Sequence, residues 1–454
     1  MVFPIAGGTQ DTGYEISNSL RFNSGDSPEL TRTFGSAGGD TWSYSCWLKR
    51  GDISQQGHGL LLDPNTNAGL YFLSTGALVI NDDGSSTHTS TELLRDPNAW
   101  YHILFTGNGT TNKVYVNNSQ LTFSGGTPNI GNINNNIAHS ISKSPAGVGY
   151  MDGYLSEIHF VDGTEKAPTD FAEFNDNAVW IPKQYTGSYG TNGFFLEFKQ
   201  TGTSANSSGI GADTSGNDNH MSVTNLAAID VTTDTPTNNF CTLNPLSAKT
   251  LTFSEGNLHA TNNGGAGSAT GTIAPTNGKW YFEITLSGAA NFAAGVVNLD
   301  DWASGTDIYS YGEAAAVLIE NNANYNVTYG NTASSPSTLQ TGTQLQTAKY
   351  GFAMDIDNND LYVSANGNWY TGSAFDNTSF SSASAVTTDL PSNVPLTAFI
   401  RNPDSVTARC NFGNPAGADT ISSGNADANG YGNFEYAVPS GYYSLCTKNL
   451  AEYG

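Results

Sequence analysis

Short segments in which apolar and polar residues alternate constrain this chain more than any other feature of its sequence. Examples are TWSYSCWLKR, WYHILFTG, KWYFEITL and DLYVSANG. A period of two places successive side chains on opposite faces of a strand. The dipeptides Asn-Gly and Asp-Gly punctuate these segments, and both tolerate the positive φ of tight hairpin turns. The pattern predicts an all-β chain built from antiparallel β-sandwiches.

The composition disfavours helices. Glycine accounts for 51 of the 454 residues, and Asn, Ser and Thr fill much of the rest. Glycine loses much backbone entropy in a helix, and Ser, Thr and Asn side chains bond nearby backbone groups instead. We expect a helical turn only at residues 169–174, TDFAEF.

A change in composition divides the chain. From residue 201 the alternation weakens and polar residues dominate, and strand patterning resumes at KTLTFSEGNLHA. We therefore expect four parts: an N-terminal arm at 1–16, a first sandwich at 17–200, a bridging hairpin and irregular linker at 201–246, and a second sandwich at 247–454. No internal repeat relates the two sandwiches.

The charge argues against two classes of partner. Sixteen basic and 40 acidic residues give a formal net charge of −24. Such a surface repels phosphate backbones and anionic lipid, so we expect no nucleic acid and no membrane insertion. No apolar run approaches the roughly 18 residues of a spanning helix. The start MVFPIAGGTQ has no basic region, so we expect no cleaved signal peptide.

The four cysteines, Cys46, Cys241, Cys410 and Cys446, have no CxxC or CxxH spacing. The spacing therefore excludes a zinc ribbon or a thioredoxin-like motif. We expect reduced thiols that act as small buried hydrophobic groups. Cys410 with Cys446 is the one pairing to check.

The histidines form no catalytic or metal-binding motif. The sequence holds seven of them, without HxH or HExxH spacing and without a neighbouring GxSxG serine. Nucleophilic triads and zinc sites are therefore unsupported. His102 and His159 lie within strand patterns, and we interpret both as structural residues of a sandwich.

The carboxylates give equally little support for hydrolysis. A glycoside hydrolase needs two of them about 5–10 Å apart, and the glucanase pattern ExDxxE is absent. Glu157 and Glu283 have no second acidic residue two positions later. Asp355 and Asp357 share a strand face, but they lead into an Asn-rich turn, and we interpret them as a solvated hairpin end. We predict that the chain is not an enzyme; glycan hydrolase activity is the less favoured alternative.

Two loops of the second sandwich combine the groups that bind sugars. They are NLDDWASGTDIYSYG at 298–312 and ANGNWYTGSAF at 365–375. Aromatic rings stack on sugar faces, while amides and carboxylates bond sugar hydroxyls at loop-borne sites. The candidate binding residues are Asp300, Asp301, Trp302, Tyr309, Asn368, Trp369 and Tyr370. The alternative is that these aromatic side chains pack locally under glycine-rich loops.

The loop GADTSGNDNH at residues 211–220 raises the question of a bound ion. As an EF-hand it fails, because Asp218 stands where Gly is needed and Thr224 where a bidentate Glu is needed. Asp213 and Asn217 are able to bond backbone amides in an Asx-type turn. We favour such a turn without a cofactor, and calcium at these two residues is the alternative.

The apolar start of the chain is a candidate docking segment. Val2, Phe3, Pro4 and Ile5 stand among small residues with no periodic pattern. An exposed apolar tag of this kind can dock into a groove on a partner protein. The alternative is a disordered start.

Longer strings resemble two known families. NSLRFNSGDSPELTRTF, TWSYSCWLKRG and GYMDGYLSEIHFVDGT follow one another as in laminin-G-like domains of the concanavalin A lectin type. GKWYFEITL, YGFAMDIDNNDLYVSANGNWY and VPLTAFIRN are similar to strands of SPRY domains. The resemblance implies a jelly-roll, concanavalin-like sandwich followed by a SPRY-like sandwich. In laminin-G-like domains the loop D-x-SGN-x-N forms a tight turn, which in some members lies near calcium.

The whole arrangement resembles large virion-associated proteins of marine bacteriophages. The likeness covers nearly the full chain and includes DTPTNNFCTLNPL and the ending NFEYAVPSGYYSLCTKNL. It implies a tail fibre or spike-type adhesin on the tail or capsid exterior, made in the host cytoplasm, that binds host surface glycan or protein. A capsid-decorating protein or a tail adaptor is the alternative. Phage fibres are commonly homotrimers, but the chain has no heptad stretch, so its symmetry stays open.

Overall fold

The computed structural model describes residues 13–454, with gaps in the ranges given next. The gaps are 37, 55–57, 83–85, 144–148, 263, 266, 288–292, 303–316, 322–323, 329–336, 342–347, 403–406, 418 and 420. In β23, β24 and β25 only the backbone is described. The predicted docking residues Val2, Phe3, Pro4 and Ile5, and the predicted binding residue Tyr309, lie outside the described residues.

The chain forms two compact units. The N-terminal unit comprises Asp11–Thr237 with Ser254–Gly256, and the C-terminal unit contains Asn238–Phe253 and Asn257–Gly454. The segment 201–246, predicted as a bridge, is divided between the units at residue 238.

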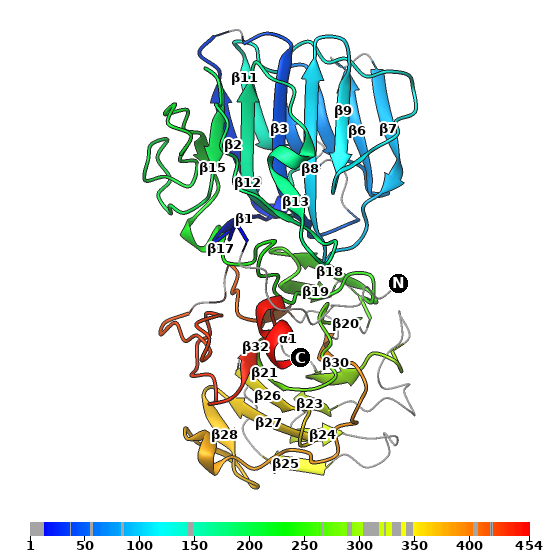
Figure 1. Ribbon diagram of the computed structural model, residues 1–454. Coiled ribbons are helices and arrows are strands. Elements are labelled where there is room, and N and C mark those ends of the chain that lie inside the picture. Colours follow the sequence, from blue (N-terminus) through cyan, green and yellow to red (C-terminus); the bar gives the residue numbers. More distant parts are fainter. Residues whose placement is uncertain are drawn as a thin grey trace. The chain divides into compact units, whose positions relative to one another are not determined.

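The N-terminal unit is a β-sandwich, drawn from blue to green in Figure 1. Its eight-stranded sheet has the order β10 (Ser119–Gln120), β9 (Asn112–Val116), β8 (Trp100–Asn108), β3 (Thr41–Arg50), β12 (Gly153–Asp162), β1 (Ser19–Phe22) and β17 (Val231–Thr232), with β15 (Phe194–Leu196) also on β12. Its seven-stranded sheet has the order β16 (Ser222–Thr224), β2 (Glu29–Thr33), β11 (Ala138–Ser142), β4 (His58–Leu62), β5 (Gly69–Phe72), β6 (Ala77–Asp82) and β7 (Ser86–Leu93). A hairpin of β13 (Ala172–Phe174) and β14 (Trp180–Pro182) stands apart.

Alternation explains how this unit builds its core. Trp42, Phe105 and Phe160 from the eight-stranded sheet share one buried cluster with Leu70 and Ile80 from the seven-stranded sheet. Burying large aromatic and aliphatic side chains between two sheets is the main stabilising term of such sandwiches. The predicted all-β sandwich is confirmed for this part of the chain.

The C-terminal unit has two further antiparallel sheets. The nine-stranded sheet has the order β18 (Leu251–Ser254), β19 (His259–Asn262), β31 (Thr407–Asn411), β21 (Lys279–Ser287), β26 (Lys349–Asp355), β27 (Asp360–Ala365), β28 (Asn368–Tyr370) and β29 (Phe375–Asn377), with the short β32 (Tyr443–Ser444) parallel to β21. The six-stranded sheet has the order β20 (Gly267–Thr270), β30 (Leu396–Asn402), β22 (Ala293–Asn298), β23 (Val317–Asn321), β24 (Asn324–Thr328) and β25 (Ser337–Thr341).

Neighbouring residues of β21 serve opposite faces of the nine-stranded sheet. Phe282 stacks on Phe352 in the main core, with ring centroids 5.1 Å apart. Tyr281 belongs instead to a smaller cluster on the other face, together with Trp369 and Phe434. This second aromatic layer, here called the outer layer, positions the site described below.

Two expectations about local structure are wrong. The strand β13 (Ala172–Phe174) occupies the second half of the segment expected to be helical, because it pairs with β14, and a 3-10 turn at Pro168–Asp170 includes the first two residues of that segment. The one α-helix of the described residues, α1 (Thr447–Tyr453), was not expected. It forms because Leu450 packs on the core of the C-terminal unit, a tertiary contact that a seven-residue pattern does not reveal.

The cysteine and carboxylate expectations have different outcomes. All four cysteines are buried and none forms a disulfide, so Cys410 and Cys446 are not paired. Asp355 is buried rather than solvated, because its carboxylate accepts from Lys279 Nζ at 2.6 Å. Asp357 is exposed and accepts the backbone N–H of Gly278 at 2.7 Å.

Candidate functional site

A cavity of about 250 Å³ opens on the outer layer of the C-terminal unit. It lies beside the hairpin of β27 and β28, the loop after β29, and the segment that follows Phe434. Its lining residues are Ser364, Asn366, Gly367, Trp369, Thr378, Tyr436 and Ala437.

The hairpin owes its shape to the dipeptide Asn366-Gly367. Both residues have positive φ, 49° and 79°, as a two-residue type I′ turn requires. The Asn366 side-chain oxygen accepts the Lys349 backbone N–H at 3.0 Å. A Cβ at Gly367 would stand 2.7 Å from the ring of Tyr436, so glycine at this position lets that ring approach. The turn therefore sets one wall of the cavity.

The predicted residues of this hairpin point to different places. Trp369 lines the cavity, with 5% of its surface exposed, and its ring meets Phe380 edge-on at 4.8 Å. Tyr370 faces the main core, as alternation requires for the next residue. Asn368 is half-buried at the start of β28. Of these three residues, only Trp369 belongs to the site.

Ser364 supplies an unusual polar group in the cavity wall. The residue is 1% exposed, and its hydroxyl has no hydrogen-bond partner in the described part of the chain. A Cβ at Gly351 would stand 2.6 Å from this hydroxyl and also 2.6 Å from the Tyr281 hydroxyl, so glycine leaves the two polar groups room. A buried hydroxyl without a partner costs free energy, which makes it a marker for a missing ligand or water.

Glu283 holds the Tyr436 wall in place. Its carboxylate accepts the backbone N–H groups of Glu435 at 3.0 Å and Tyr436 at 2.9 Å, and the Tyr281 hydroxyl at 3.1 Å. Burial raises the pKa of this carboxyl, and the backbone N–H donors oppose that rise. The contacts make Glu283 a positioning residue for the Tyr436 wall.

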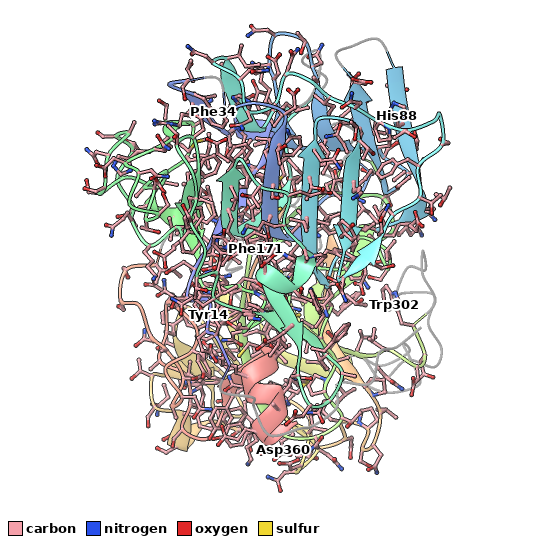
Figure 2. All side chains as sticks on the ribbon, turned by 45° about the horizontal axis from the view of Figure 1, so that its top comes forward. Tyr14, Phe34, His88, Phe171, Trp302 and Asp360 are labelled. Carbon is pink, nitrogen blue, oxygen red and sulfur yellow. The ribbon has the colours of Figure 1, made fainter. Side chains whose placement is uncertain are left out.

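The other predicted aromatic loop is separate in the fold. It follows β22 of the six-stranded sheet, whereas Trp369 belongs to the nine-stranded sheet. Asn298 Nδ2 donates to Asp301 at 2.8 Å, and Asn298 accepts the Asp300 N–H at 3.1 Å, so these residues close a turn. Trp302, labelled in Figure 2, packs against Phe399 with ring centroids 5.5 Å apart.

The loop 211–220 is built as a turn. The Asp213 carboxylate accepts the N–H groups of Phe195, Ser215 and Asn219, each at 2.8 Å, and the Ser215 hydroxyl at 3.0 Å. Asn217 Nδ2 donates to the carbonyls of Gly190 and Gly193. Within the described ranges, no three His, Cys, Asp or Glu side chains are grouped so as to hold a metal.

The N-terminal unit has its own buried polar cluster. Glu157 has a φ of 48° at an irregularity between β12 and β3, and this brings its carboxylate within 3.4 Å of His159 Nε2. Tyr14 donates to Glu157 at 3.1 Å, and Tyr189 bonds the other ring nitrogen of His159 at 2.8 Å. Phe171, seen with Tyr14 in Figure 2, packs over His159 with ring centroids 5.1 Å apart.

Trp180, on β14, also covers His102. Trp180 Nε1 donates to His102 Nδ1 at 3.3 Å, and Ser45 bonds Nε2 at 2.8 Å. Burial lowers the pKa of His102 to about 3, so the ring is neutral in the folded protein. These contacts fit the structural role expected of His102.

Several residues of the site were missed from the sequence. Ser364, Thr378, Tyr436 and Ala437 carry no motif, and Asn366 and Gly367 were recognised only as turn residues. The available signal was the string ANGNWY, which contains the turn and Trp369. Among the described residues, no helix has the length and hydropathy to cross a membrane.

Comparisons with known proteins agree with parts of the expected architecture. Residues 23–169 match the laminin G family model described as the concanavalin A-like lectin/glucanases superfamily. The chain therefore contains a concanavalin-like domain in its N-terminal unit. A comparison with curated protein sequences found no significant match.

Solved structures that resemble the chain include two SPRY domains. The SPRY domain of human HERC1 is 13% identical with a TM-score of 0.29, and the match covers 39% of this chain and 99% of that domain. The TRIM65 PSpry domain is 12% identical with a TM-score of 0.28, and the match covers 37% of this chain and 89% of that domain.

Proposed function

We propose that the chain is a non-enzymatic virion adhesin whose C-terminal unit binds a ligand from the host surface in the cavity beside Trp369. The observation that carries the proposal is the unbonded, buried Ser364 hydroxyl in a concave site walled by aromatic rings. Small-molecule sites typically combine such apolar walls with a few polar groups that fix orientation.

The chemistry of the cavity favours binding over catalysis. Among the residues that the structure describes, the lining contains no Asp, Glu, His, Lys or Cys. Glu283, behind the wall, is engaged by two backbone N–H groups and the Tyr281 hydroxyl. Glycoside hydrolysis needs two carboxylates facing one another across the substrate, and the cavity offers none.

The virion setting rests on the resemblance of the sequence to phage virion-associated proteins. The match of residues 23–169 to a lectin-type family model supports a recognition role. Under the proposal, the partners are other virion proteins and a host surface glycan or protein. The protein is a homo-oligomer on the exterior of the tail or capsid.

Adsorption of phage to host cells tests this proposal. Virions that carry Tyr436→Ala are expected to adsorb at least about 10-fold more slowly, because the variant removes a cavity wall. Tyr431→Ala is the matched control, since Tyr431 is a half-buried tyrosine of the same unit that does not line the cavity.

Normal adsorption by a folded Tyr436→Ala protein would contradict the adhesin and favour a capsid-decorating protein or a tail adaptor. Antibody labelling of virions in negative stain separates those two roles. A decorating protein is spread over the shell, whereas an adaptor lies at the tail.

A further inference from the structure

We infer that the cavity binds one neutral pyranose ring, the terminal residue of a glycan, through a hydrogen bond to Ser364. This inference deepens the proposed function and rests on it. It follows from the size of the cavity, its lack of charge, and its unpartnered hydroxyl.

Size limits the ligand to a single small ring. Pockets for drug-sized ligands measure about 300–1,000 Å³, and this cavity, at about 250 Å³, lies just below that range. A single sugar ring is a smaller object than a drug-sized ligand. A longer glycan or a folded peptide segment would have to remain mostly outside, so we assign the cavity to a terminal residue.

The absence of charge in the lining selects against acidic sugars. Of the two glutamates beside Tyr436, Glu283 holds the Tyr436 backbone from behind the wall, and Glu435 accepts from Ser422. The Lys349 ammonium, on the strand next to β27, pairs with Asp419 at 2.8 Å. A carboxylate taken into this site would lose water without gaining a cation, which is strongly unfavourable. The high negative charge of the whole chain acts in the same direction.

The polar groups match sugar hydroxyls better than an apolar peptide side chain. A serine hydroxyl both donates and accepts, as does a sugar hydroxyl. The Asn366 side-chain oxygen is occupied by the Lys349 N–H, and its amide N–H groups are further donors on an exposed residue. A leucine or valine side chain would fill the space between the aromatic walls. It would leave the Ser364 hydroxyl without a hydrogen bond, and the desolvation of that hydroxyl would then be uncompensated.

The aromatic walls suit the CH face of a pyranose. Trp369 and Tyr436 stand on segments far apart in the sequence, and both contribute to the lining together with the methyl group of Ala437. Thr378 adds an exposed hydroxyl at the rim. Apolar walls with one buried hydroxyl and polar groups at the rim fit a ring that is apolar on its face and polar at its edge.

Titration of the full-length protein with methyl glycosides tests the inference. The probes are the methyl glycosides of glucose, galactose, mannose and N-acetylglucosamine, and of glucuronic acid as the acidic counterpart, followed by ligand-observed NMR and calorimetry. We expect at least one neutral glycoside to bind at least about 10-fold more tightly than the glucuronide. Equal or tighter binding of the glucuronide would overturn the inference.

Ser364→Ala separates a ligand contact from a structural role. The change removes a hydroxyl that has no partner, so we expect the free protein to keep or raise its melting temperature while neutral sugar binding weakens about 5-fold. Ser381→Ala, at an exposed serine outside the cavity, should change neither. A lower melting temperature for Ser364→Ala, or undiminished sugar binding, would contradict the assigned role.

The outcomes also separate this inference from the proposed function. If no glycoside binds but Tyr436→Ala virions adsorb slowly, the neutral sugar is wrong and the adhesin stands, and a host surface peptide becomes the ligand to test. If adsorption is normal, the adhesin itself is wrong. Sugar binding that Tyr436→Ala leaves unchanged would place any glycan site elsewhere and overturn the inference.

Discussion

Glu157 in the N-terminal unit and Glu283 in the C-terminal unit are similar residues in different surroundings. Each lies on a central strand of its sheet, is almost fully buried, and accepts a tyrosine hydroxyl, from Tyr14 and Tyr281 respectively. Around Glu157, the polar cluster is covered by rings from the segment after β12. The Glu283 carboxylate instead accepts the backbone N–H groups of Glu435 and Tyr436, and Tyr436 lines the cavity.

The difference shows that aromatic and carboxylate residues on a sheet face do not by themselves make a site. In the N-terminal unit, Phe171 and Trp180 pack on the two histidines and cover that face. In the C-terminal unit, the wall formed by Tyr436 leaves Ser364 with an unused hydroxyl. Coverage by the connecting segments therefore decides between a packed layer and an open cavity.

The largest expected effect separates the two glutamates directly. Glu283→Ala leaves two partly buried backbone N–H groups and the buried Tyr281 hydroxyl unbonded, so we expect a loss of about 4 kcal/mol in the free energy of unfolding. Glu157→Ala should cost only about 2 kcal/mol, because half-buried Tyr14 can turn its hydroxyl to water. Denaturant unfolding measures both, and equal losses would remove the distinction drawn between the units.

The second effect concerns pH and belongs to the N-terminal unit. Burial raises the pKa of Asp152 from 3.8 to about 7. The folded form thus holds this proton more tightly than the unfolded chain, so the contribution to stability is full below pH 3.8 and is lost as the pH rises through 7. Between pH 4 and pH 8 the wild type should lose about 3 kcal/mol that Asp152→Asn does not lose.

Thermal unfolding across that pH range checks this expectation. Asp357→Asn, at an exposed aspartate of the C-terminal unit, serves as the control and should follow the wild type. If Asp152→Asn shows the wild-type pH dependence, the carboxyl does not carry the effect.

A smaller effect compares one glycine from each unit. Gly367 and Gly216 have φ values of 79° and 93°, but a Cβ would meet Tyr436 only at Gly367, while at Gly216 nothing lies within 4 Å. We expect Gly216→Ala to cost about 1 kcal/mol from backbone strain alone. Gly367→Ala should cost about 2 kcal/mol because the ring must also move. Under the proposed adhesin function, only Gly367→Ala should slow phage adsorption; equal effects on adsorption would show that Tyr436 is not part of the proposed site.

The smallest effect is expected from removing calcium. The Asp213 carboxylate already takes four hydrogen bonds from its own turn and from Phe195, so the turn needs no ion. The melting temperature should stay the same in excess chelator and in added calcium. A rise on adding calcium, with calcium found by elemental analysis, would restore the ion-binding alternative.

Local patterns in the sequence were sufficient for the strands and for one decisive turn. KWYFEITL and DLYVSANG form β21 and β27, since alternation is a property of neighbouring residues. Asn366-Gly367 forms its hairpin because both residues accept positive φ. Asn117 and Asn118 form a similar turn between β9 and β10, with φ values of 47° and 71°, although this turn has no Asn-Gly or Asp-Gly dipeptide.

The candidate site was predictable only in part. Trp369 was identified from its loop, but the sequence did not show that Tyr370 is excluded from the site. Which of the two side chains faces the cavity depends on which face of the sheet the outer layer covers. Ser364 looked like any strand serine. Tyr436 is held at the site by a hydrogen bond from its backbone N–H to Glu283, which lies 153 positions earlier in the sequence.

The amino-acid sequence was enough to predict an all-β protein, the positions of most of its strands, and an aromatic hairpin in its second half. Those properties follow from periodicity and turn chemistry, which act over a few residues. Three features were visible only in the folded protein: Glu157 meets His159 beneath a covering layer, Asp355 is paired and buried, and Ser364, Trp369 and Tyr436 line one cavity. Such contacts depend on how distant segments pack over a sheet face, and that packing is selected by the free energy of the whole unit.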